Sequence, residues 1–160
     1  MGMVGGGRGA FIGAIHRIAA LMDGQVELVC GAFSSDPVSA KVSGEALYLD
    51  DARCYASYQE MFAKEAQLPL GERMDFVAIV TPNHLHFPVA RMALECGFDV
   101  MSDKPATYSL AEALELEGIV RRSGRLYGLT HAYTGYPLMK EARYRVAQGE
   151  LGTVKKVVVE

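Results

Sequence analysis

The sequence predicts an α/β fold with a doubly wound parallel sheet. Short apolar runs of strand length alternate with helical patterns, and a glycine-rich segment separates the first strand from the first helix. Half of the 160 residues are hydrophobic and 22% are charged, which is enough for one core of ordinary size. Because parallel neighbours need a crossover connection, this alternation favours a parallel sheet.

The first elements form a predicted βαβ unit. The run "MVGG" ends a buried strand, a helix that Gly24 closes follows, and "VELVCGAF" (Val26 to Phe33) is a second strand covered on both faces. The apolar residues of the helix recur at steps of four, three and four, which places them on one face. They are Phe11, Ile15, Ile18 and Met22.

Further strands and helices follow in alternation. Strands are predicted over 75–80, 99–102 and 125–130, and helices over 87–96 and 110–123. Ser109 and Glu112 form a capping box at the start of the last helix, and Gly124 stands just past its end.

Residues 34–73 are less regular. We predict a helix over 57–66 with Met61 and Phe62 directed inward, and "CYA" just before it is a candidate short strand.

The last thirty residues carry a different pattern. Pro137 and Gly149 mark the two ends of a helix, and "TVKKVVVE" is a β-branched strand that stops at Glu160. We therefore expect residues 1–130 to form a dinucleotide-binding domain. Residues 131–160 would be the connecting helix and first strand of a truncated C-terminal substrate domain, so the usual second α/β domain is lacking. An unpaired strand over 153–160 would self-associate or lose order.

Composition excludes several classes of function. The net charge is −3 and the Lys and Arg residues are scattered, which argues against nucleic acid or an anionic membrane as partner. Glycines and charges interrupt the apolar N-terminus, so it does not resemble a signal peptide, and no apolar run reaches membrane-spanning length. The three cysteines have no metal-type spacing. We expect a cytoplasmic protein with a small-molecule substrate.

The glycine turn is a candidate phosphate site. Gly5, Gly7 and Ala10 satisfy G-x-G-x-x-[G/A], and Gly5, Gly7 and Gly13 form a longer version. Between a first strand and a first helix, backbone N–H groups of such a turn bind a pyrophosphate. The alternative is a tight turn whose glycines serve only helix packing.

The end of the second strand bears on the choice between NAD and NADP. An acidic residue there normally binds the adenosine ribose, but this chain has Ser34 and Ser35, with Asp36 slightly later. NADP is therefore allowed, with Arg8 and Lys41 as candidate phosphate partners. Asp36 could instead cap a helix that begins at Pro37.

The loop after the strand over 75–80 faces the expected ligand crevice. It contains Thr81, Pro82, Asn83 and His84. A metal pair of His84 and His86 is the alternative, but neither a carboxylate nor a thiolate lies beside them, so we predict no metal.

The segment "SDKPAT" occupies the same place one strand later. Lys104 could hold a substrate hydroxyl and stabilise the alkoxide that develops as hydride leaves. Pro105 is a candidate for a cis peptide bond. The alternative is a solvated pair of Asp103 and Lys104 on a surface loop.

Four motifs together resemble the Gfo/Idh/MocA family of NAD(P)-dependent sugar and polyol dehydrogenases. They are "GMVGGGRGAFIGAIHR", "VAIVTPNHLHFPVA", "DKPAT" in place of Glu-Lys-Pro, and "THAYTGYPLMKEAR" with "GELGTVKKVVVE". The resemblance implies a Rossmann domain, and it implies Lys104 as the catalytic lysine and Tyr133 on the substrate side. It implies a cofactor site of Gly5, Gly7, Arg8, Gly9, Ala10, Phe11, Ile12, Thr81, Pro82, Asn83, His84 and Lys104. The position of Ser34 and Ser35 after the second strand, and of Asp103 and Pro105 beside Lys104, adds these four residues to the predicted cofactor site.

The resemblance also implies a function. We expect an oxidoreductase that transfers hydride between a sugar or cyclitol hydroxyl and NAD(P), working as a homo-oligomer. The family's catalytic histidine and aspartate lie in a second domain to which nothing here corresponds, so the 160 residues alone are expected to be inactive. A non-catalytic module that senses NAD(P) is the alternative.

Overall fold

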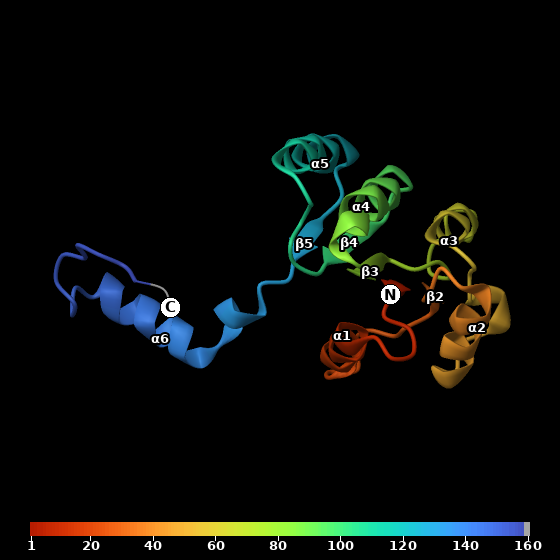
Figure 1. The fold of residues 1–160 in the computed structure, drawn as a ribbon, viewed down its shortest axis with the longest axis horizontal. Coiled ribbons are helices and arrows are strands. Elements are labelled where there is room, and N and C mark those ends of the chain that lie inside the picture. Colours follow the sequence, from red (N-terminus) through yellow and green to blue (C-terminus); the bar gives the residue numbers. More distant parts are fainter. Residues whose placement is uncertain (159–160) are drawn as a thin grey trace. The chain divides into compact units, whose positions relative to one another are not determined.

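A five-stranded parallel sheet forms the centre of residues 1–130 (Figure 1). The strands pair in the order β2-β1-β3-β4-β5, and every pair is parallel. The computed structural model describes residues 1–158. The predicted doubly wound sheet is confirmed. The strands are β1 (Gly2–Gly5), β2 (Cys30–Ala32), β3 (Phe76–Val80), β4 (Asp99–Ser102) and β5 (Tyr127–Leu129).

The strand order places β1 and β3 side by side at the centre of the sheet. From β1 the chain runs to β2 on one side, whereas β4 and β5 lie on the other side of β3. The register pairs Gly5 with Val80 and Ile79 with Ser102, so these three strands end at the same edge. In such sheets the ligand crevice lies where the strand order reverses, outside the carboxyl ends of the central strands.

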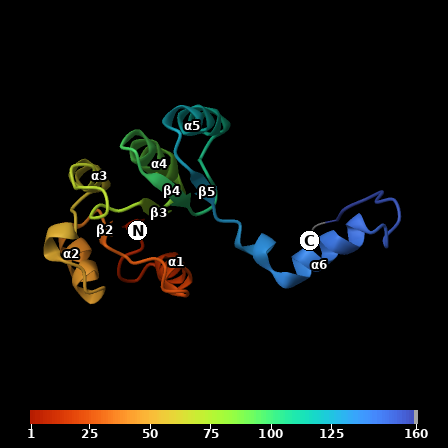
Figure 2. The same cartoon turned by 180° about the vertical axis from the view of Figure 1, so that it is seen from behind.

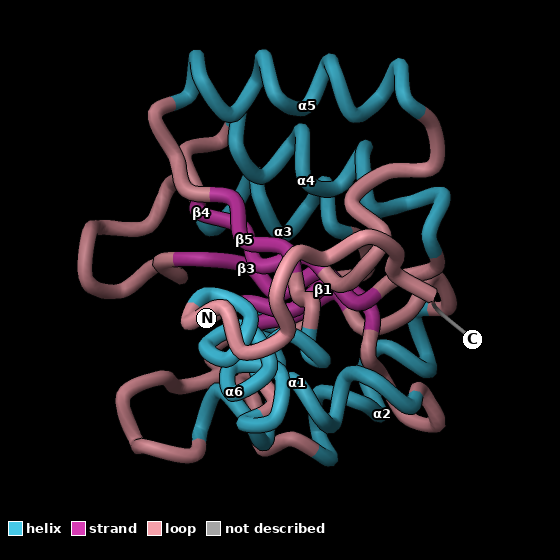
Figure 3. Tube along the Cα trace, turned by 90° about the vertical axis from the view of Figure 1, so that its left-hand side faces the viewer, coloured by secondary structure: helices cyan, strands magenta, loops and turns pink. Residues whose placement is uncertain are grey.

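Helices cover both faces of the sheet, as Figures 2 and 3 show. One face is covered by α3, α4 and α5, and α1 and α2 lie on the other side of the strands. The core between β3, α3 and α4 contains the rings of Phe62 and Phe98, whose centroids are 6.1 Å apart. The five helices are α1 (Phe11–Leu21), α2 (Pro37–Ala46), α3 (Tyr58–Glu65), α4 (His86–Glu95) and α5 (Leu110–Ser123).

The helix α1 forms where the sequence predicts it, but its apolar stripe lies outward. Gly13 is the buried residue of α1. A Cβ atom at Gly13 would lie 2.4 Å from the Cα of Gly6, so the helix packs on the glycine turn through its smallest side chain. The predicted apolar face is exposed as a result: Phe11 is 82% exposed, Ile15 49%, Ile18 62% and Met22 79%.

The capping signals predicted for α5 are confirmed. The Ser109 hydroxyl accepts a hydrogen bond from the Glu112 N–H, and the Glu112 carboxylate accepts one from the Ser109 N–H. Gly124 ends the helix in the left-handed conformation. The inward positions of Met61 and Phe62 on α3 are also confirmed, because both side chains are fully buried.

The helix α2 is not predicted over its full range, although Asp36 is named as a candidate cap for a helix that begins at Pro37. The Asp36 carboxylate accepts a hydrogen bond from the Ser39 N–H at 2.8 Å, and Pro37 is the first helical residue. The buried positions of α2 are the small residues Ala40, Ser43 and Gly44. A helix that turns such residues inward has no apolar periodicity for a sequence pattern to detect.

The strand β2 is shorter than predicted. The expected strand begins at Val26, but β2 pairs with β1 over Cys30–Ala32 only. Before Cys30, the backbone N–H of Val29 donates to the Met1 carbonyl oxygen. The candidate strand "CYA" reduces to one parallel bridge between Gly31 and Cys54.

Residues from His131 onward form a second compact unit. It contains a 3-10 turn, Ala132–Gly135, and α6 (Pro137–Ala147), whose start at Pro137 is confirmed. Residues 153–158 of the strand predicted over 153–160 have no strand partner among the described residues, so the strand stays a prediction. A strand needs a neighbour to satisfy its backbone groups. Residues 159–160 lie outside the described residues.

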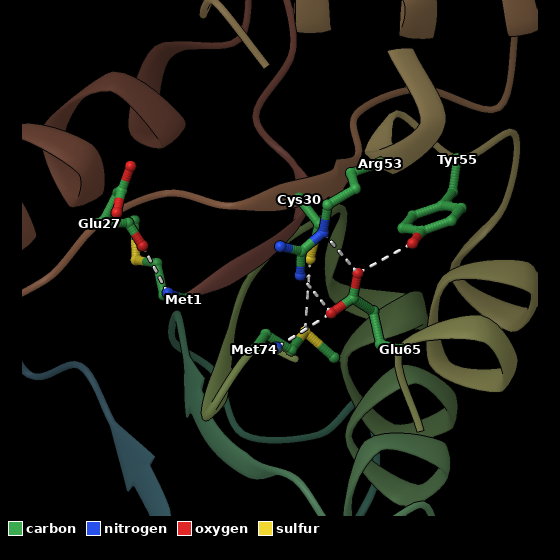
Figure 4. Close-up of polar contacts among 7 residues, drawn as sticks. All are labelled: Met1, Glu27, Cys30, Arg53, Tyr55, Glu65 and Met74. Atoms are coloured by element: carbon green, nitrogen blue, oxygen red, sulfur yellow. Dashed lines mark hydrogen bonds and ion pairs between the residues drawn. The ribbon is translucent and has the colours of Figure 1, made fainter. Parts of the chain in front are cut away.

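A buried polar cluster lies near the amino end of β3, which Met74 precedes (Figure 4). The Glu65 carboxylate is fully buried, and the Arg53 guanidinium donates to it through Nε and Nη2 at 3.0 and 2.6 Å. The Tyr55 hydroxyl and the Met74 N–H donate to the same carboxylate at 2.8 and 3.0 Å. These bonds tie α3 to the segments that precede it and follow it.

The cysteines behave as small apolar residues. All three are free thiols, and burial raises the pKa of Cys30 to about 12. Within residues 1–158, every helix is too short or too polar to cross a membrane.

Candidate nucleotide-binding site

The candidate site lies at the carboxyl edge of the sheet, where four loops follow four strands. These loops begin after β1, β2, β3 and β4 and carry most of the predicted cofactor-binding residues. The others are Gly5, at the end of β1, and Phe11 and Ile12, at the start of α1. The N–H of Asp103 donates to the carbonyl oxygen of Ile79 at 2.9 Å, which holds the loop after β4 beside the end of β3. The strand register therefore brings together segments that are up to a hundred residues apart in the sequence.

The glycine turn after β1 is shaped by close contacts. Gly5, Gly6 and Gly9 have positive φ angles of 81°, 70° and 83°. A Cβ atom at Gly7 would lie 2.8 Å from Ser43 Oγ and 2.9 Å from the carbonyl oxygen of Phe33. The bare backbone at Gly7 is thus a requirement of this packing.

Two side chains hold the glycine turn from outside. The Arg17 guanidinium of α1 donates to the Gly6 carbonyl oxygen at 2.8 Å. The Ser43 hydroxyl of α2 accepts from the Arg8 N–H at 3.0 Å and donates to the Ser39 carbonyl oxygen at 2.6 Å. Ser43 is not among the predicted site residues, because nothing in its local sequence pattern links α2 to this turn.

The start of α1 has the features of an anion site. Its N-cap residue, Ala10, makes no side-chain capping bond, and the first turn holds no acidic residue. The first N–H groups of a helix carry a partial positive charge and need acceptors. Arg8, Gly9, Ala10 and Phe11 are all exposed at this end of the helix.

The loop after β2 settles the two interpretations of Asp36. Its carboxylate accepts from both the N–H and the hydroxyl of Ser39, and these bonds lower the pKa of Asp36. Asp36 is therefore the N-cap of α2, as the alternative proposed. Ser34 accepts from the Asp36 N–H, Ser35 is exposed, and Lys41 pairs with Asp51 at 3.4 Å.

The loop after β3 exposes three of its four predicted residues. Pro82, Asn83 and His84 are exposed, whereas the Thr81 hydroxyl oxygen is buried and has no hydrogen-bond partner in the described part of the chain. A buried hydroxyl without a partner is costly and fits a site that a polar ligand completes.

The two histidines of this loop do not form a metal pair. His84 is exposed, and His86 is 1% exposed with both ring nitrogens facing carbonyl oxygens. Among residues 1–158, no three His, Cys, Asp or Glu side chains gather closely enough to hold a metal ion.

The loop after β4 presents the candidate lysine. Lys104 is exposed, and its N–H donates to the Asp103 carboxylate at 2.8 Å. The peptide bond between Lys104 and Pro105 is cis, as the sequence suggested. Burial lowers the pKa of His16 on α1, and the negative charge of Asp103 acts in the opposite direction. The negative charge of Asp103 thus acts on His16 of α1.

Tyr133, the predicted substrate-side residue, belongs to the second unit. Its ring packs edge-on against Tyr136 at 5.6 Å, and its side chain is 75% exposed. Its role beside the substrate stays a prediction.

The arrangement fits a dinucleotide. The family model described as an oxidoreductase family with an NAD-binding Rossmann fold, GFO_IDH_MocA, matches residues 1–131. The chain belongs to this family, and the predicted NAD-binding Rossmann domain is confirmed.

Similar proteins cover nearly all of this chain. The uncharacterized oxidoreductase YfiI of Bacillus subtilis is 37% identical over 97% of this chain and 39% of its own length. The D-xylose 1-dehydrogenase (NADP(+)) of Hypocrea jecorina is 32% identical over 69% of this chain and 26% of its own. The crystal structure of an inositol dehydrogenase homolog from Azotobacter vinelandii, complexed with NADH and myo-inositol, superposes with a TM-score of 0.92. It is 42% identical and covers 96% of this chain and 40% of that chain. The chain thus spans about two fifths of the length of the first and third of these proteins.

Proposed function

We propose that this chain is the nucleotide-binding part of a dehydrogenase that transfers hydride between a sugar or cyclitol hydroxyl and NAD(P). One observation carries the proposal: the glycine turn and the Lys104 loop lie at the same edge of the sheet, on either side of the loop after β3. A hydride transfer needs both reactants held in near contact, and this edge offers a phosphate cradle and a cationic side chain together.

The pyrophosphate would bind at the glycine turn. The uncapped start of α1 and the exposed Gly9 offer N–H donors and a partial positive charge, whereas the N–H groups of Arg8 and Ala10 already donate within the protein. The guanidinium of Arg8 adds a full positive charge at an exposed position. Gly7 keeps the turn in contact with Phe33 and Ser43.

The adenosine ribose would lie at Ser34 and Ser35. No free carboxylate stands at this point, because the Asp36 carboxylate is held by Ser39 as a helix cap. Two hydroxyl groups accept a ribose, and they do not repel a 2′-phosphate. Both NAD and NADP are therefore compatible with this loop.

The reacting end would lie between the loops after β3 and β4. A bound nicotinamide supplies the hydride acceptor or donor. Thr81, Pro82, Asn83 and His84 would line it, while the Lys104 ammonium donates a hydrogen bond to the substrate oxygen and stabilises the alkoxide. Asp103 holds the backbone N–H of Lys104, which fixes the start of that side chain.

The substrate-binding site would be completed by residues outside the Rossmann domain. We propose that residues 131–160 lead into a substrate domain that carries Tyr133 near the substrate and supplies the base for its hydroxyl proton. The greater length of the similar proteins supports this proposal. Residues 1–160 by themselves would then bind nucleotide and turn over little substrate.

The test is a titration of the protein with NADH and NADPH, followed by nicotinamide fluorescence. Saturable binding is expected, and Gly7→Val should weaken it at least tenfold because the added side chain meets backbone and Ser43. Gly135→Val is the matched control, since a Cβ at Gly135 meets no atom within 4 Å. A folded wild-type protein that binds neither nucleotide would contradict the proposal. Binding without any oxidation of polyols by the complete protein would favour a sensing module instead.

A further inference from the structure

His86 joins the two loops that carry the reacting end of the candidate site. It is the first residue of α4 and is 1% exposed. Its Nε2 atom lies 2.9 Å from the Thr81 carbonyl oxygen, and its Nδ1 atom lies 2.5 Å from the Pro105 carbonyl oxygen. One side chain thus contacts the first residue after β3 and the last residue of "DKP".

The contact with Pro105 matters because that segment has few other attachments. Pro105 has no N–H to donate, and the Lys104 N–H is used within its own loop by Asp103. Among the described residues, the His86 contact is the one hydrogen bond that joins residues 104–106 to another segment. Without it, the backbone beyond Asp103 would be held by packing alone.

We propose that His86 is a positioning residue, which holds the "DKP" loop against the loop after β3 and thereby sets where the Lys104 ammonium lies. What that ammonium does there rests on the proposed function. The attachment itself does not, because both carbonyl oxygens and the imidazole belong to this chain.

The geometry separates this role from two others. A metal ligand needs a free ring nitrogen, and both nitrogens of His86 already face carbonyl oxygens. A group that exchanges protons with a substrate needs access to it, and His86 is buried beneath the loops. The remaining role is to fix the backbone on either side.

Two substitutions divide the contacts of His86 between them. In His86→Asn, the side-chain nitrogen is as far from the backbone as Nδ1, so the variant can keep the bond to Pro105. In His86→Gln, the nitrogen is as far out as Nε2, so the variant can keep the contact with the Thr81 carbonyl oxygen and loses the hydrogen bond to Pro105. Val89→Ala, in the same helix and fully buried in the core, controls for lost stability.

The first experiment measures hydrogen exchange of the backbone N–H groups of Lys104, Ala106 and Thr107 in the nucleotide-free protein. His86→Gln should speed this exchange at least tenfold, whereas the exchange rates of His86→Asn should stay within threefold of the wild type. Val89→Ala should lower the melting temperature without changing these exchange rates. Equal exchange in His86→Gln and wild type would overturn the proposal. So would equal acceleration in all three variants, which is the result of a general loss of stability.

The second experiment measures how fast an acylating reagent modifies the Lys104 amine with and without NADH. NADH should protect Lys104 in the wild type and in His86→Asn, but protect it at least fivefold less in His86→Gln, under conditions where NADH saturates each protein. Equal protection in both variants would overturn the positioning of Lys104 by His86. A wild-type Lys104 that bound NADH leaves unprotected would instead refute the proposed role of Lys104, and the exchange result would still decide the attachment.

Discussion

At the scale of single residues, four hydrogen bonds satisfy the buried carboxylate of Glu65 (Figure 4). Burial alone would raise the pKa of this carboxyl, but the bonds from Arg53, Met74 and Tyr55 outweigh it and hold the pKa below its ordinary value of 4.5. The ionised form is therefore the one that stabilises the fold.

We expect Glu65→Gln to lower the free energy of unfolding by about 3 kcal/mol at neutral pH. This is the low end of the range for breaking a buried ion pair, because the Arg53 side chain keeps 22% of its surface exposed. Urea unfolding measures the loss. Glu117→Gln is the control, since its ion pair with Arg121 is exposed and should change stability by less than about 0.5 kcal/mol.

The same carboxylate predicts a dependence on pH. Because the pKa of Glu65 is lower in the folded state, its contribution is present above pH 4.5 and is lost as the pH falls through the folded-state value. The difference in stability between wild type and Glu65→Gln should shrink on acidification below pH 4.5. A difference that stays constant down to the acid unfolding of the protein would contradict this assignment.

A substitution at Ser35 should change the preference between NADH and NADPH. Ser35→Asp places a negative charge on the loop after β2, where it would repel a 2′-phosphate at an interaction energy of about 1–2 kcal/mol. We expect the dissociation constant for NADPH to rise about tenfold, with little change for NADH, as measured by nicotinamide fluorescence. Ser35→Asn adds the same bulk without the charge and should leave both constants unchanged.

At the scale of elements, the caps explain which helices the sequence reveals. The helix α5 has a serine, a glutamate and a glycine at the positions where its own unpaired backbone groups need partners. These interactions are local, so the sequence pattern alone identifies them. The buried residues of α2 are small, so its role in holding the glycine turn through Ser43 becomes visible only in three dimensions.

The capping box of α5 gives a prediction at this scale. Ser109→Ala should cost about 1 kcal/mol of stability, because the Glu112 N–H loses its acceptor. Glu112→Gln should cost less, since a glutamine can still reach the Ser109 N–H. Urea unfolding of the two variants measures both losses of stability. A loss in Glu112→Gln that equals or exceeds the loss in Ser109→Ala would show that the cap contributes through the charge of Glu112 alone.

At the scale of the whole molecule, the core belongs to one unit. Among residues 1–158, all of the buried hydrophobic residues lie between Met1 and Ile119, within the unit that ends at Thr130. Residues 131–158 contribute none of them. The Rossmann unit therefore contains what it needs to bury apolar surface.

We expect a variant that ends at Thr130 to fold and to bind NADH. Its melting temperature should lie within a few degrees of the longer chain, and its dissociation constant within threefold, because the core and all four loops of the candidate site are retained. Circular dichroism and the NADH titration test this. An unfolded truncated variant would show that the second unit supports the first.

The sequence by itself determined the alternation of strands and helices, the caps and the glycine turn, because backbone hydrogen bonding and glycine geometry depend on neighbouring residues. Only the tertiary structure decided which face of α1 lies outward, why Gly7 must be bare, and how His86 and Ser43 hold the site. These depend on contacts between segments distant in the sequence, which exist only once the sheet aligns the ends of its strands.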